Sequence, residues 1–417
     1  MDTQKQPKFF YGWVMVAVGI LVVAASIGLV ANTFPIYIVP VGQELDLSRS
    51  QMSVNQTLFA AGMMIVQFFW GPVFSRLKLI RTMRISAVIT CVGYLLYAFA
   101  QSFWQFISIS AVLSLTMAFL SWMPFTVIIN NWFYEKRGLA LGITFMGSGI
   151  GGMLFNALGG VLVASVGWRA TVMIYTGVLC LLLLPTVFFL LKLKPEDMGL
   201  LPYGQTQVQA ERPPEGLTLS QALGTRVFLP ICLCSLVTGF SNNSLNATIT
   251  PHLQQLGYSG VFAASVASAY LAALAAGKIV LGQVTDRLGA IKATALALSA
   301  IALSACGMLG AHLLPVALCT VPVMGLGNAF GSVAFPLISR SVFGEKDHAA
   351  ITGVLSAMSG IGSTVGPLLC GLIFDLNGSY HLAYVAMIVL LIPLGILMLQ
   401  AMRRHIADSP IPEKTTP

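Results

Sequence analysis

The sequence predicts an all-α polytopic membrane protein of twelve transmembrane helices, arranged as two pseudo-repeats of six helices each. Three observations support this prediction. The 417 residues are 57% hydrophobic and 9% charged, with a mean hydropathy of +0.85, whereas soluble domains carry about 25% charged residues. The apolar residues fall into runs of about 20, the length that crosses a bilayer as a helix. One sequence offset relates the two halves. A single soluble domain and a disordered chain are therefore excluded.

Twelve apolar runs are long enough to span a membrane. Backbone N–H and C=O groups in lipid must be satisfied within their own segment, so each run is expected to be a helix. The expected spans are residues 11–40, 52–74, 85–101, 104–129, 138–166, 171–191, 228–251, 261–283, 293–312, 315–338, 351–374 and 382–402.

A polar connection separates the sixth run from the seventh. It is rich in proline and acidic residues, a composition typical of a linker. We therefore expect a six-helix bundle in residues 1–191, a cytoplasmic linker in 192–225, a second six-helix bundle in 226–402 and a cytoplasmic tail in 403–417.

An offset of 211 residues aligns the two halves of the chain. It places Gly71 on Gly282, and it aligns residues 148–151 with residues 359–362, both of which read S-G-I-G. Among 40 glycines one match would be chance. A single offset that holds from the second span to the end of the fifth is not, so the halves are expected to be parallel repeats.

The cations predict the topology. If both termini and the 2–3, 4–5, 6–7, 8–9 and 10–11 loops share one side, that side holds all but three of the 22 Lys and Arg residues. The exceptions are Arg49 and Arg169 on the other side and Lys278 within a span. By the positive-inside rule the basic side is cytoplasmic, so both termini face the cytoplasm. The expected location is the plasma membrane, the inner membrane of a bacterium.

Two residue types near or within the spans have expected structural roles. Tryptophans near span ends commonly anchor helices at the membrane surface. The seven cysteines lie in apolar runs with no CxxC pair, so we expect packing residues and neither disulfides nor a metal site. The expected anchors are Trp13, Trp70, Trp104, Trp132 and Trp168.

Residues 282–292 read G-Q-V-T-D-R-L-G-A-I-K. This segment resembles the G-x-x-x-D-R-x-G-x-x-[RK] signature of the major facilitator superfamily. Residues 71–81 are a degenerate copy, with Ser75 in place of the aspartate. The resemblance covers essentially the whole chain. It implies two six-helix bundles around a central cavity that opens alternately to either side.

The signature contains one acidic residue, Asp286. The resemblance implies that this acid approaches the start of span 5, where Lys136 and Arg137 lie. A carboxylate near a helix N-terminus contributes about 0.3–2 kcal/mol, which suits a latch that opens in each cycle; a static surface ion pair is the alternative. The expected gating and motif residues are Gly71, Arg76, Lys136, Arg137, Gly282, Asp286, Arg287 and Gly289.

Two further segments resemble one branch of the superfamily, that of the oxalate:formate antiporter and the monocarboxylate transporters. They are residues 11–13, Y-G-W, and residues 131–142, N-W-F-Y-E-K-R-G-L-A-L-G. Asn131 and Trp132 are adjacent here, whereas the branch has one residue between them. In that branch an arginine on span 8 binds the carboxylate of the substrate, and the resemblance places Lys278 at its position.

Lys278 is the single cation within a span. A lysine at mid-span costs about 2.5–3.5 kcal/mol on translocon scales, so we expect it to face a wet cavity and bind a substrate. Snorkelling to the cytoplasmic surface is the alternative. The resembling oxalate exchanger has a second cation on span 11, at the position of Ser359. One cation in place of two favours a compound with one carboxylate.

Other polar side chains within the spans are further candidate ligands. Tyr270 lies eight residues before Lys278, near the same helical face. For each of the amides, a hydrogen bond to a neighbouring helix is the alternative role. The expected substrate-binding residues are Lys278, Tyr270, Asn32, Tyr37, Asn242, Asn243, Asn246, Asn328 and Ser359.

The predicted function is secondary active transport of a small organic monoanion by alternating access. Proton-coupled members of the branch use an acid on span 8, and Leu274 occupies that position here. Exchange for a counter-anion and proton symport both remain open, the second with a Lys278 that is neutral in the empty site. Efflux of neutral or amphiphilic compounds is the alternative on the same fold, and a non-transporting sensor is the alternative from another class.

Enzymatic chemistry is not expected. Residues 147–152, G-S-G-I-G-G, imitate a phosphate loop, but they follow no strand and lack the Lys-Ser/Thr ending, so close helix packing is expected of them. The expected partners are a small organic anion, the lipid bilayer, and protons or a counter-anion. No cofactor, nucleic acid or catalytic residue is expected, and the protein is expected to be a monomer.

Overall fold

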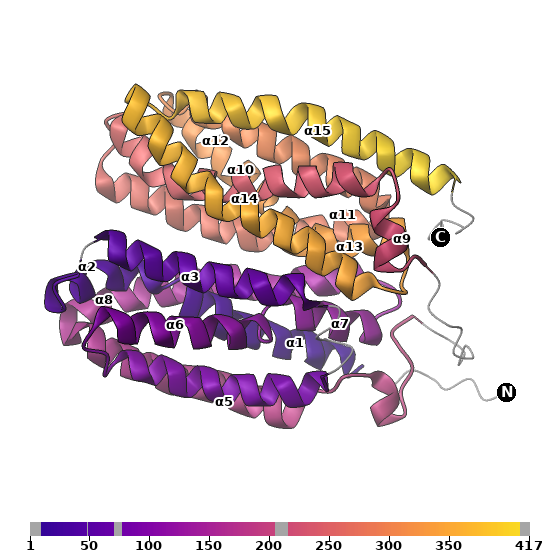
Figure 1. Ribbon diagram of the computed structural model, residues 1–417, viewed down its shortest axis with the longest axis horizontal. Coiled ribbons are helices and arrows are strands. Elements are labelled where there is room, and N and C mark those ends of the chain that lie inside the picture. Colours follow the sequence, from indigo (N-terminus) through magenta and orange to yellow (C-terminus); the bar gives the residue numbers. More distant parts are fainter. Residues whose placement is uncertain (1–9, 48, 71–76, 205–215, 409–417) are drawn as a thin grey trace. The chain divides into compact units, whose positions relative to one another are not determined.

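The computed structural model describes residues 10–47, 49–70, 77–204 and 216–408. Apart from loops and two isolated β-bridges, these residues are helical. The chain divides into two compact units, Met1–Ala210 and Glu211–Pro417. Figure 1 shows the helices of the first unit in indigo to magenta and those of the second in pink to yellow.

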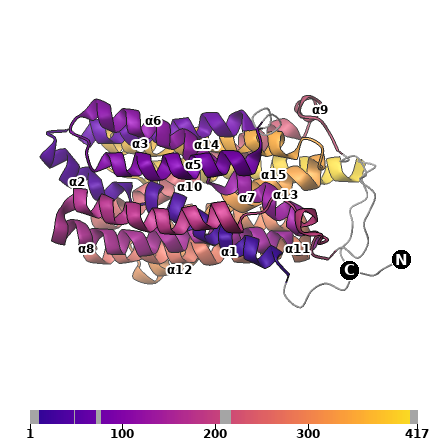
Figure 2. The same cartoon turned by 90° about the horizontal axis from the view of Figure 1, so that it is seen from below.

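The first unit contains the spans of the N-terminal half. α1 and the π-helical η1 pack on α8, and α6 packs against both α3 and α5 (Figure 2). The elements are α1 (Gly12–Val23), η1 (Ala24–Ala31), α2 (Phe34–Glu44), α3 (Arg49–Phe68), α5 (Leu79–Tyr97), α6 (Phe103–Ala118), α7 (Trp122–Trp132), α8 (Arg137–Pro185), the π-helical η2 (Thr186–Leu190) and the 3₁₀-helical η3 (Pro195–Met198).

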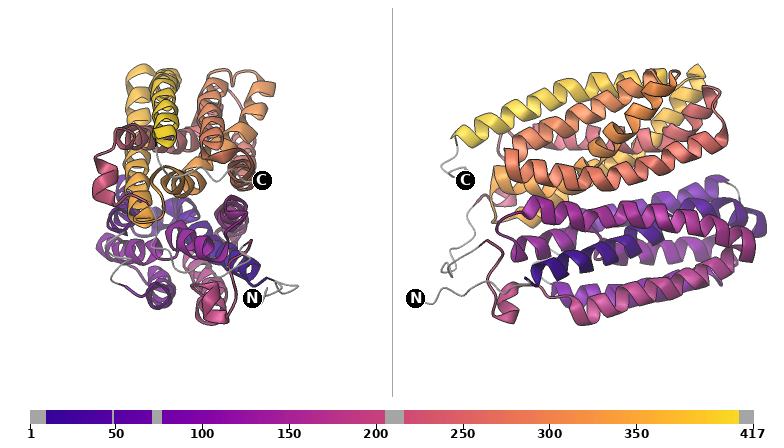
Figure 3. Two further views of the ribbon diagram at one scale, coloured as in Figure 1. Left: turned by 90° about the vertical axis from the view of Figure 1, so that its right-hand side faces the viewer. Right: turned by 180° about the vertical axis from the view of Figure 1, so that it is seen from behind.

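The second unit contains the spans of the C-terminal half. α10 packs along α14, and α11 packs along α12 and α15, so that the long helices of this unit run lengthwise beside one another (Figure 3). The elements are α9 (Leu219–Leu223), α10 (Phe228–Gln255), α11 (Gly260–Leu309), α12 (Leu314–Asn328), α13 (Phe330–Phe343), α14 (His348–Asn377) and α15 (His381–Asp408).

Two glycines divide the longest helices into two spans each. Gly167 in α8 has φ 80° and ψ 164°, and Gly289 in α11 has φ 83° and ψ 164°. Glycine adopts this left-handed φ at little cost because it has no Cβ. Within the described residues nine helices are long and apolar enough to cross a membrane, and α3 adds a shorter apolar stretch, Thr57–Phe68. Once α8 and α11 are each counted as two, the twelve expected spans are all accounted for.

The internal repeat is visible in the helix contacts. Gly28 and Gly239 are 211 residues apart, and each lies where the first span of its unit crosses the fifth. A Cβ built on Gly28 would lie 2.7 Å from Cα of Gly151, and one built on Gly239 would overlap the backbone of Ser359. No larger residue fits at these crossings. Close helix packing is thus confirmed as the role of the glycine-rich segment 147–152.

The two units differ in their first spans. In the first unit, residues Ala24–Ala31 form a π-helical segment, and a turn at residues 32–33 precedes α2. The equivalent residues of the second unit, 235–242, lie within the uninterrupted α10. π-helical turns often occur at functional sites. Residues Phe34–Glu44 are therefore a helix of their own, which the apolar run 11–40 did not predict.

The anchoring role expected of the tryptophans is wrong for three of the five. Trp104 is 73% exposed, as an anchor should be, but Trp70, Trp132 and Trp168 are 1%, 0% and 4% exposed. The indole N–H of Trp132 donates to the Lys192 carbonyl at 3.2 Å, and Phe119 packs on Trp70. These three rings are buried inside the protein, so they do not serve as anchors at the membrane surface.

The described ends of the linker lie along equivalent loops of the two units. Tyr203 forms an isolated β-bridge with Phe133, and Gly216 forms one with Gly344. Phe133 and Gly344 are 211 residues apart, and each lies just before the fifth span of its unit. Each end of the linker is thus part of the unit that it adjoins.

Candidate functional site

Lys278 lies on α11 next to a close crossing with α12. Its side chain is 5% exposed. At the preceding residue, Gly277, a Cβ would lie 2.7 Å from the Gly325 carbonyl oxygen and 2.8 Å from Cα of Leu326 on α12. A lysine that snorkels to the surface exposes its ammonium group, so this burial argues against the snorkelling alternative. Burial of an ammonium group costs several kcal/mol unless hydrogen bonds and opposite charge offset it.

The structure brings three predicted site residues together at the end of α12. Asn328 is the last residue of α12, and its side-chain amide donates to the hydroxyl of Tyr270 on α11. Asn242 on α10 donates to the Gly327 carbonyl at 3.5 Å. We call Tyr270, Asn328 and Asn242 the α12-end cluster. Tyr270 precedes Lys278 by eight residues, about 12 Å along a helix.

Two predicted asparagines occupy equivalent positions and join equivalent helices. Asn32 donates to the Ser148 carbonyl at 3.2 Å, and Asn243 donates to the Ser363 carbonyl at 2.5 Å. Asn32 and Asn243 are 211 residues apart. Each therefore connects the first span of its unit to the fifth, which is the alternative role of these amides.

The remaining candidates lie apart from the α12-end cluster. The hydroxyl groups of Tyr37 and Tyr94 are 3.3 Å apart and form a hydrogen bond between α2 and α5. Asn246 is exposed on α10. Ser359 is half-buried on α14, where its backbone packs against Gly239. The structure thus groups four of the nine predicted ligands, Lys278 and the α12-end cluster, on adjoining helices of the second unit.

The motif residues of the 8–9 loop mark the end of a span. Gly282 is buried in α11, Asp286 is half-buried one turn later, and Arg287 is exposed. Gly289 then breaks the helix with its positive φ. The predicted Gly71 and Arg76 lie outside the described residues.

The start of α8 carries the other predicted gating residues. Lys136 precedes the helix with φ 56°, an uncommon conformation for a lysine, and its Nζ lies 3.4 Å from the hydroxyl of Tyr203. Arg137 donates to the Phe133 carbonyl and lies over the ring of Tyr134, 5.3 Å from its centroid. Both cations thus organise the loop before α8 within the first unit.

The two segments that resemble the monocarboxylate branch pack against each other. Trp13 of the Y-G-W segment meets the ring of Phe133 edge-on, with centroids 5.1 Å apart. Tyr203 of the linker packs on the same Phe133 ring at 5.7 Å. Such aromatic contacts contribute about 0.5–1.5 kcal/mol beyond burial. The resemblance carried by these two segments therefore reflects a single cluster of packed aromatic rings.

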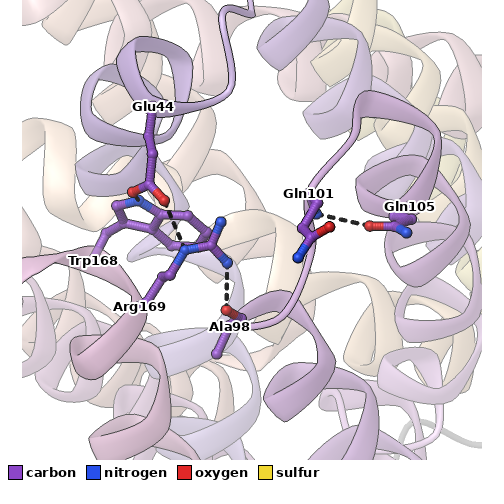
Figure 4. Close-up of polar contacts among 6 residues, drawn as sticks. All are labelled: Glu44, Ala98, Gln101, Gln105, Trp168 and Arg169. Carbon is purple, nitrogen blue, oxygen red and sulfur yellow. Dashed lines mark hydrogen bonds and ion pairs between the residues drawn. The ribbon is translucent and has the colours of Figure 1, made fainter.

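Sequence reasoning missed an ionic cluster that joins the end of α2 to α8 in the first unit (Figure 4). The carboxylate of Glu44, the last residue of α2, accepts a 2.8 Å hydrogen bond from Nε of Arg169 and a 2.5 Å one from the indole N–H of Trp168. A second guanidinium N–H donates to the Ala98 carbonyl at 2.5 Å, and the guanidinium lies 4.3 Å from the Trp168 ring centroid. We call Glu44, Trp168 and Arg169 the Glu44 clamp.

The Glu44 clamp fixes the end of α2 to two other parts of its unit. Ala98 follows α5, and Gly167, which separates the two spans of α8, directly precedes Trp168. The hydrogen bonds from Arg169 and Trp168 lower the pKa of the Glu44 carboxyl. The available sequence signal was the unusual position of Arg169, one of two cations assigned to the outer side.

Comparisons with known proteins identify the family. The chain matches the model of the Major Facilitator Superfamily over residues 16–334 and 231–416. An MFS-type transporter of Gibberella moniliformis is 24% identical, covering 86% of this chain and 84% of its own. Monocarboxylate transporter 13 of Rattus norvegicus is 23% identical over 91% of this chain and 86% of its own. Multidrug resistance protein MdtG of Rahnella sp. is 29% identical over 44% and 43%.

The family match and the helices agree on the fold. The predicted all-α fold of twelve membrane-spanning helices is confirmed. The substrates in the names of the relatives differ, so the family assignment reaches the level of transport and not that of the substrate. This chain belongs to the major facilitator superfamily and is an integral, multi-pass membrane transporter.

Proposed function

We propose that this protein is a secondary active transporter of a small organic monoanion, and that the ammonium group of Lys278 binds the carboxylate of the transported compound. The observation that carries the proposal is the burial of Lys278 within a membrane-spanning helix, at 5% exposure. Intramembrane lysines are costly, and those that are retained generally serve a substrate or an ion. A bound carboxylate offsets that cost by a charge-assisted hydrogen bond.

The surroundings of Lys278 support a substrate with one charge and a polar or aromatic body. The α12-end cluster offers amide and hydroxyl groups on α10, α11 and α12. The position that carries a second cation in the resembling exchanger holds the uncharged Ser359. The similarity to monocarboxylate transporter 13 over 91% of this chain supports the same class of compound.

The substrate class is tested by uptake into proteoliposomes. Wild type is compared with Lys278→Ala and Lys278→Met over a set of monocarboxylates from acetate to benzoate; the Met variant keeps most of the side-chain volume. We expect saturable uptake of at least one compound by wild type and its loss in both variants. Uptake that is unchanged in the variants would show that the substrate charge binds elsewhere.

The coupling mechanism is proposed as either exchange or proton symport. Exchange needs no proton carrier, whereas symport requires Lys278 to take up its proton together with the anion. Uptake is measured against an imposed pH gradient in vesicles without internal substrate. Uptake that follows the gradient supports symport, and uptake that requires a preloaded counter-anion supports exchange.

Efflux of neutral or amphiphilic compounds is the second candidate function. It is favoured by the 29% identity to multidrug resistance protein MdtG, although this covers only 44% of the chain. A buried cation repels cationic compounds, so efflux of such compounds would not use the charge of Lys278. This candidate therefore predicts that Lys278→Met leaves efflux intact. Efflux of a cationic and a neutral dye by wild type and variant therefore separates the two candidates.

We also propose the membrane orientation and the division of the chain. The distribution of Lys and Arg supports cytoplasmic termini in the plasma membrane, a bacterial inner membrane, and a monomer is proposed. The proposed divisions are bundles in 1–191 and 226–402, the linker in 192–225 and the tail in 403–417. The orientation is tested in intact cells that express variants with a cysteine in the C-terminal tail. If the tail is cytoplasmic, a membrane-impermeant thiol reagent should not label these cysteines.

A further inference from the structure

The hydroxyl group of Tyr270 has a proton that the protein leaves unused. Tyr270 lies on α11 with its side chain 2% exposed, and its hydroxyl oxygen accepts a hydrogen bond from the side-chain amide of Asn328. A tyrosine hydroxyl both accepts and donates, and among the described residues no acceptor receives its proton. Buried donors are nearly always paired, and an unpaired one costs about 1–3 kcal/mol. The Tyr270 hydroxyl is therefore available to donate to a bound compound.

Another buried tyrosine of the same unit, Tyr384, has a protein acceptor for its proton. Its side chain is 0% exposed, and its hydroxyl donates to Oγ1 of Thr248 at 3.0 Å, which joins α15 to α10. Tyr270 differs because the neighbouring Asn328 offers its hydroxyl a donor and not an acceptor.

The rest of the α12-end cluster orients this hydroxyl. Asn328 ends α12, and Asn242 on α10 donates to the carbonyl of the preceding residue, Gly327, at 3.5 Å. The amide of Asn328 occupies one lone pair of the Tyr270 oxygen, so the hydroxyl proton is directed away from Asn328. The cluster thus presents a donor in a fixed direction.

The spacing of Tyr270 and Lys278 sets the length of a compound that reaches both. The two residues are eight positions apart on α11, about 12 Å along the helix axis. Long side chains of a helix incline toward its N-terminus, so both polar groups move in the same direction and keep a separation of about 12 Å. A hydrogen bond at each end occupies about 3 Å, which leaves about 6 Å between the two ligand atoms.

The residue midway between them is apolar. Leu274 lies four positions from each, near the same face of α11, and is half-buried. An apolar side chain between two polar groups favours a compound with an apolar middle. A benzene ring that carries an oxygen para to its carboxylate has this length and this distribution of polarity.

We propose that the Tyr270 hydroxyl donates a hydrogen bond to a second polar group of the transported monocarboxylate, an oxygen about 6 Å from the carboxylate that Lys278 binds. The substrate class is a monocarboxylate with an apolar, ring-sized middle and a hydroxyl, ether or carbonyl oxygen at its far end. This inference rests on the function proposed above and adds a requirement that Lys278 does not impose. Acetate and unsubstituted benzoate lack this oxygen and leave the Tyr270 proton unpaired.

The inference is tested by uptake of para-hydroxybenzoate and para-methylbenzoate into proteoliposomes, because the two compounds differ only by a hydroxyl and a methyl group of similar size. We expect the KM of wild type to be about tenfold lower for the hydroxy compound, the effect of one buried hydrogen bond. Meta-hydroxybenzoate, whose hydroxyl lies nearer to the carboxylate, should resemble the methyl compound. Tyr270→Phe keeps the ring and removes the hydroxyl, so the ratio of the two KM values should fall to about one.

Tyr384→Phe is the matched control, since it removes a buried tyrosine hydroxyl that bonds another helix of the same unit. It should leave the ratio of the two KM values as in wild type. All variants are checked for monodisperse elution and thermal unfolding, and the comparison of compounds in wild type tests the inference without any variant.

The inference is overturned if wild type does not take up para-hydroxybenzoate, if its KM values for the hydroxy and methyl compounds are equal, or if Tyr270→Phe keeps the wild-type ratio. The proposed function still stands in these cases when another monocarboxylate is taken up and Lys278→Met abolishes that uptake. Full uptake by Lys278→Met instead overturns the proposed function itself.

Discussion

At the scale of single residues, the Glu44 clamp depends on two charged side chains that are partly exposed. The side chains of Glu44 and Arg169 are 48% and 30% exposed. Ion pairs of this kind contribute at most about 1 kcal/mol, because water and salt screen them. The clamp joins residues that are 125 positions apart. The sequence singles out Arg169 as one of two cations assigned to the outer side, but it does not indicate the partner of Arg169.

The pH dependence of the clamp follows from the lowered pKa of Glu44. A carboxyl with a lowered pKa in the folded state adds stability above its unfolded pKa, and that stability is lost as the pH falls through the folded value. We expect Glu44→Gln to lower the free energy of unfolding by less than about 1 kcal/mol at pH 7. Thermal unfolding in detergent should show this difference shrinking below pH 4.5, the ordinary value of the group. An equal difference at every pH would show that the charge is not involved.

Substitution of Asn243 tests whether its side-chain amide bonds a neighbouring helix or binds the substrate. Its amide donates to the Ser363 carbonyl, and such bonds contribute on average about 0.6 and at most about 1.7 kcal/mol within membranes. We expect Asn243→Ala to lower the free energy of unfolding by that amount and to leave the KM of uptake unchanged. Asn32→Ala should behave alike in the first unit. A higher KM with unaltered stability would instead assign Asn243 to the substrate.

At the scale of the elements, both glycine breaks join two spans without a longer loop. Gly289 was predicted as part of the loop motif, and its conformation gives the reason: at φ 83° a residue with a Cβ is strained. The π-helical segment of the first span had no such signal, because the apolar run 11–40 continues through it. Hydrophobicity locates a span in the sequence, but the hydrogen-bond pattern within it depends on what packs around it.

Asp286 lies one turn before this break. Its substitution tests the latch that the sequence predicts for this carboxylate. We expect Asp286→Asn to fold as wild type does and to lower the maximal rate of uptake. The accessibility of a cysteine at Ser332, a buried position on α13, to a thiol reagent applied from the cytoplasmic side should also change. The experiment needs a background without the exposed Cys306 and Cys319. Equal labelling of this cysteine with and without the Asp286→Asn substitution would leave only a static surface role for the carboxylate.

At the scale of the whole molecule, the repeat explains why the fold was predictable. The offset of 211 residues relates the crossings at Gly28 and Gly239, the amides of Asn32 and Asn243, and the positive φ angles of Gly167 and Gly378. These matches in sequence therefore correspond to matches in structure. The approximate positions of the spans followed from hydrophobicity.

The candidate site was less predictable than the fold. The sequence identifies Lys278 because a charge within a span is rare. It also shows which amide side chains lie within the spans, but it does not show what each of them bonds to. Asn32 and Tyr37 bond to neighbouring helices, and Asn246 is exposed, which no single-sequence pattern reveals.

The central claim is that the charge of the transported compound binds Lys278. The most direct test is calorimetric binding of a transported monocarboxylate to the purified protein, wild type against Lys278→Met. The account predicts a loss of affinity of about 30-fold or more in the variant, the cost of removing one partner of a buried charge pair. Equal affinity in the two proteins would contradict it.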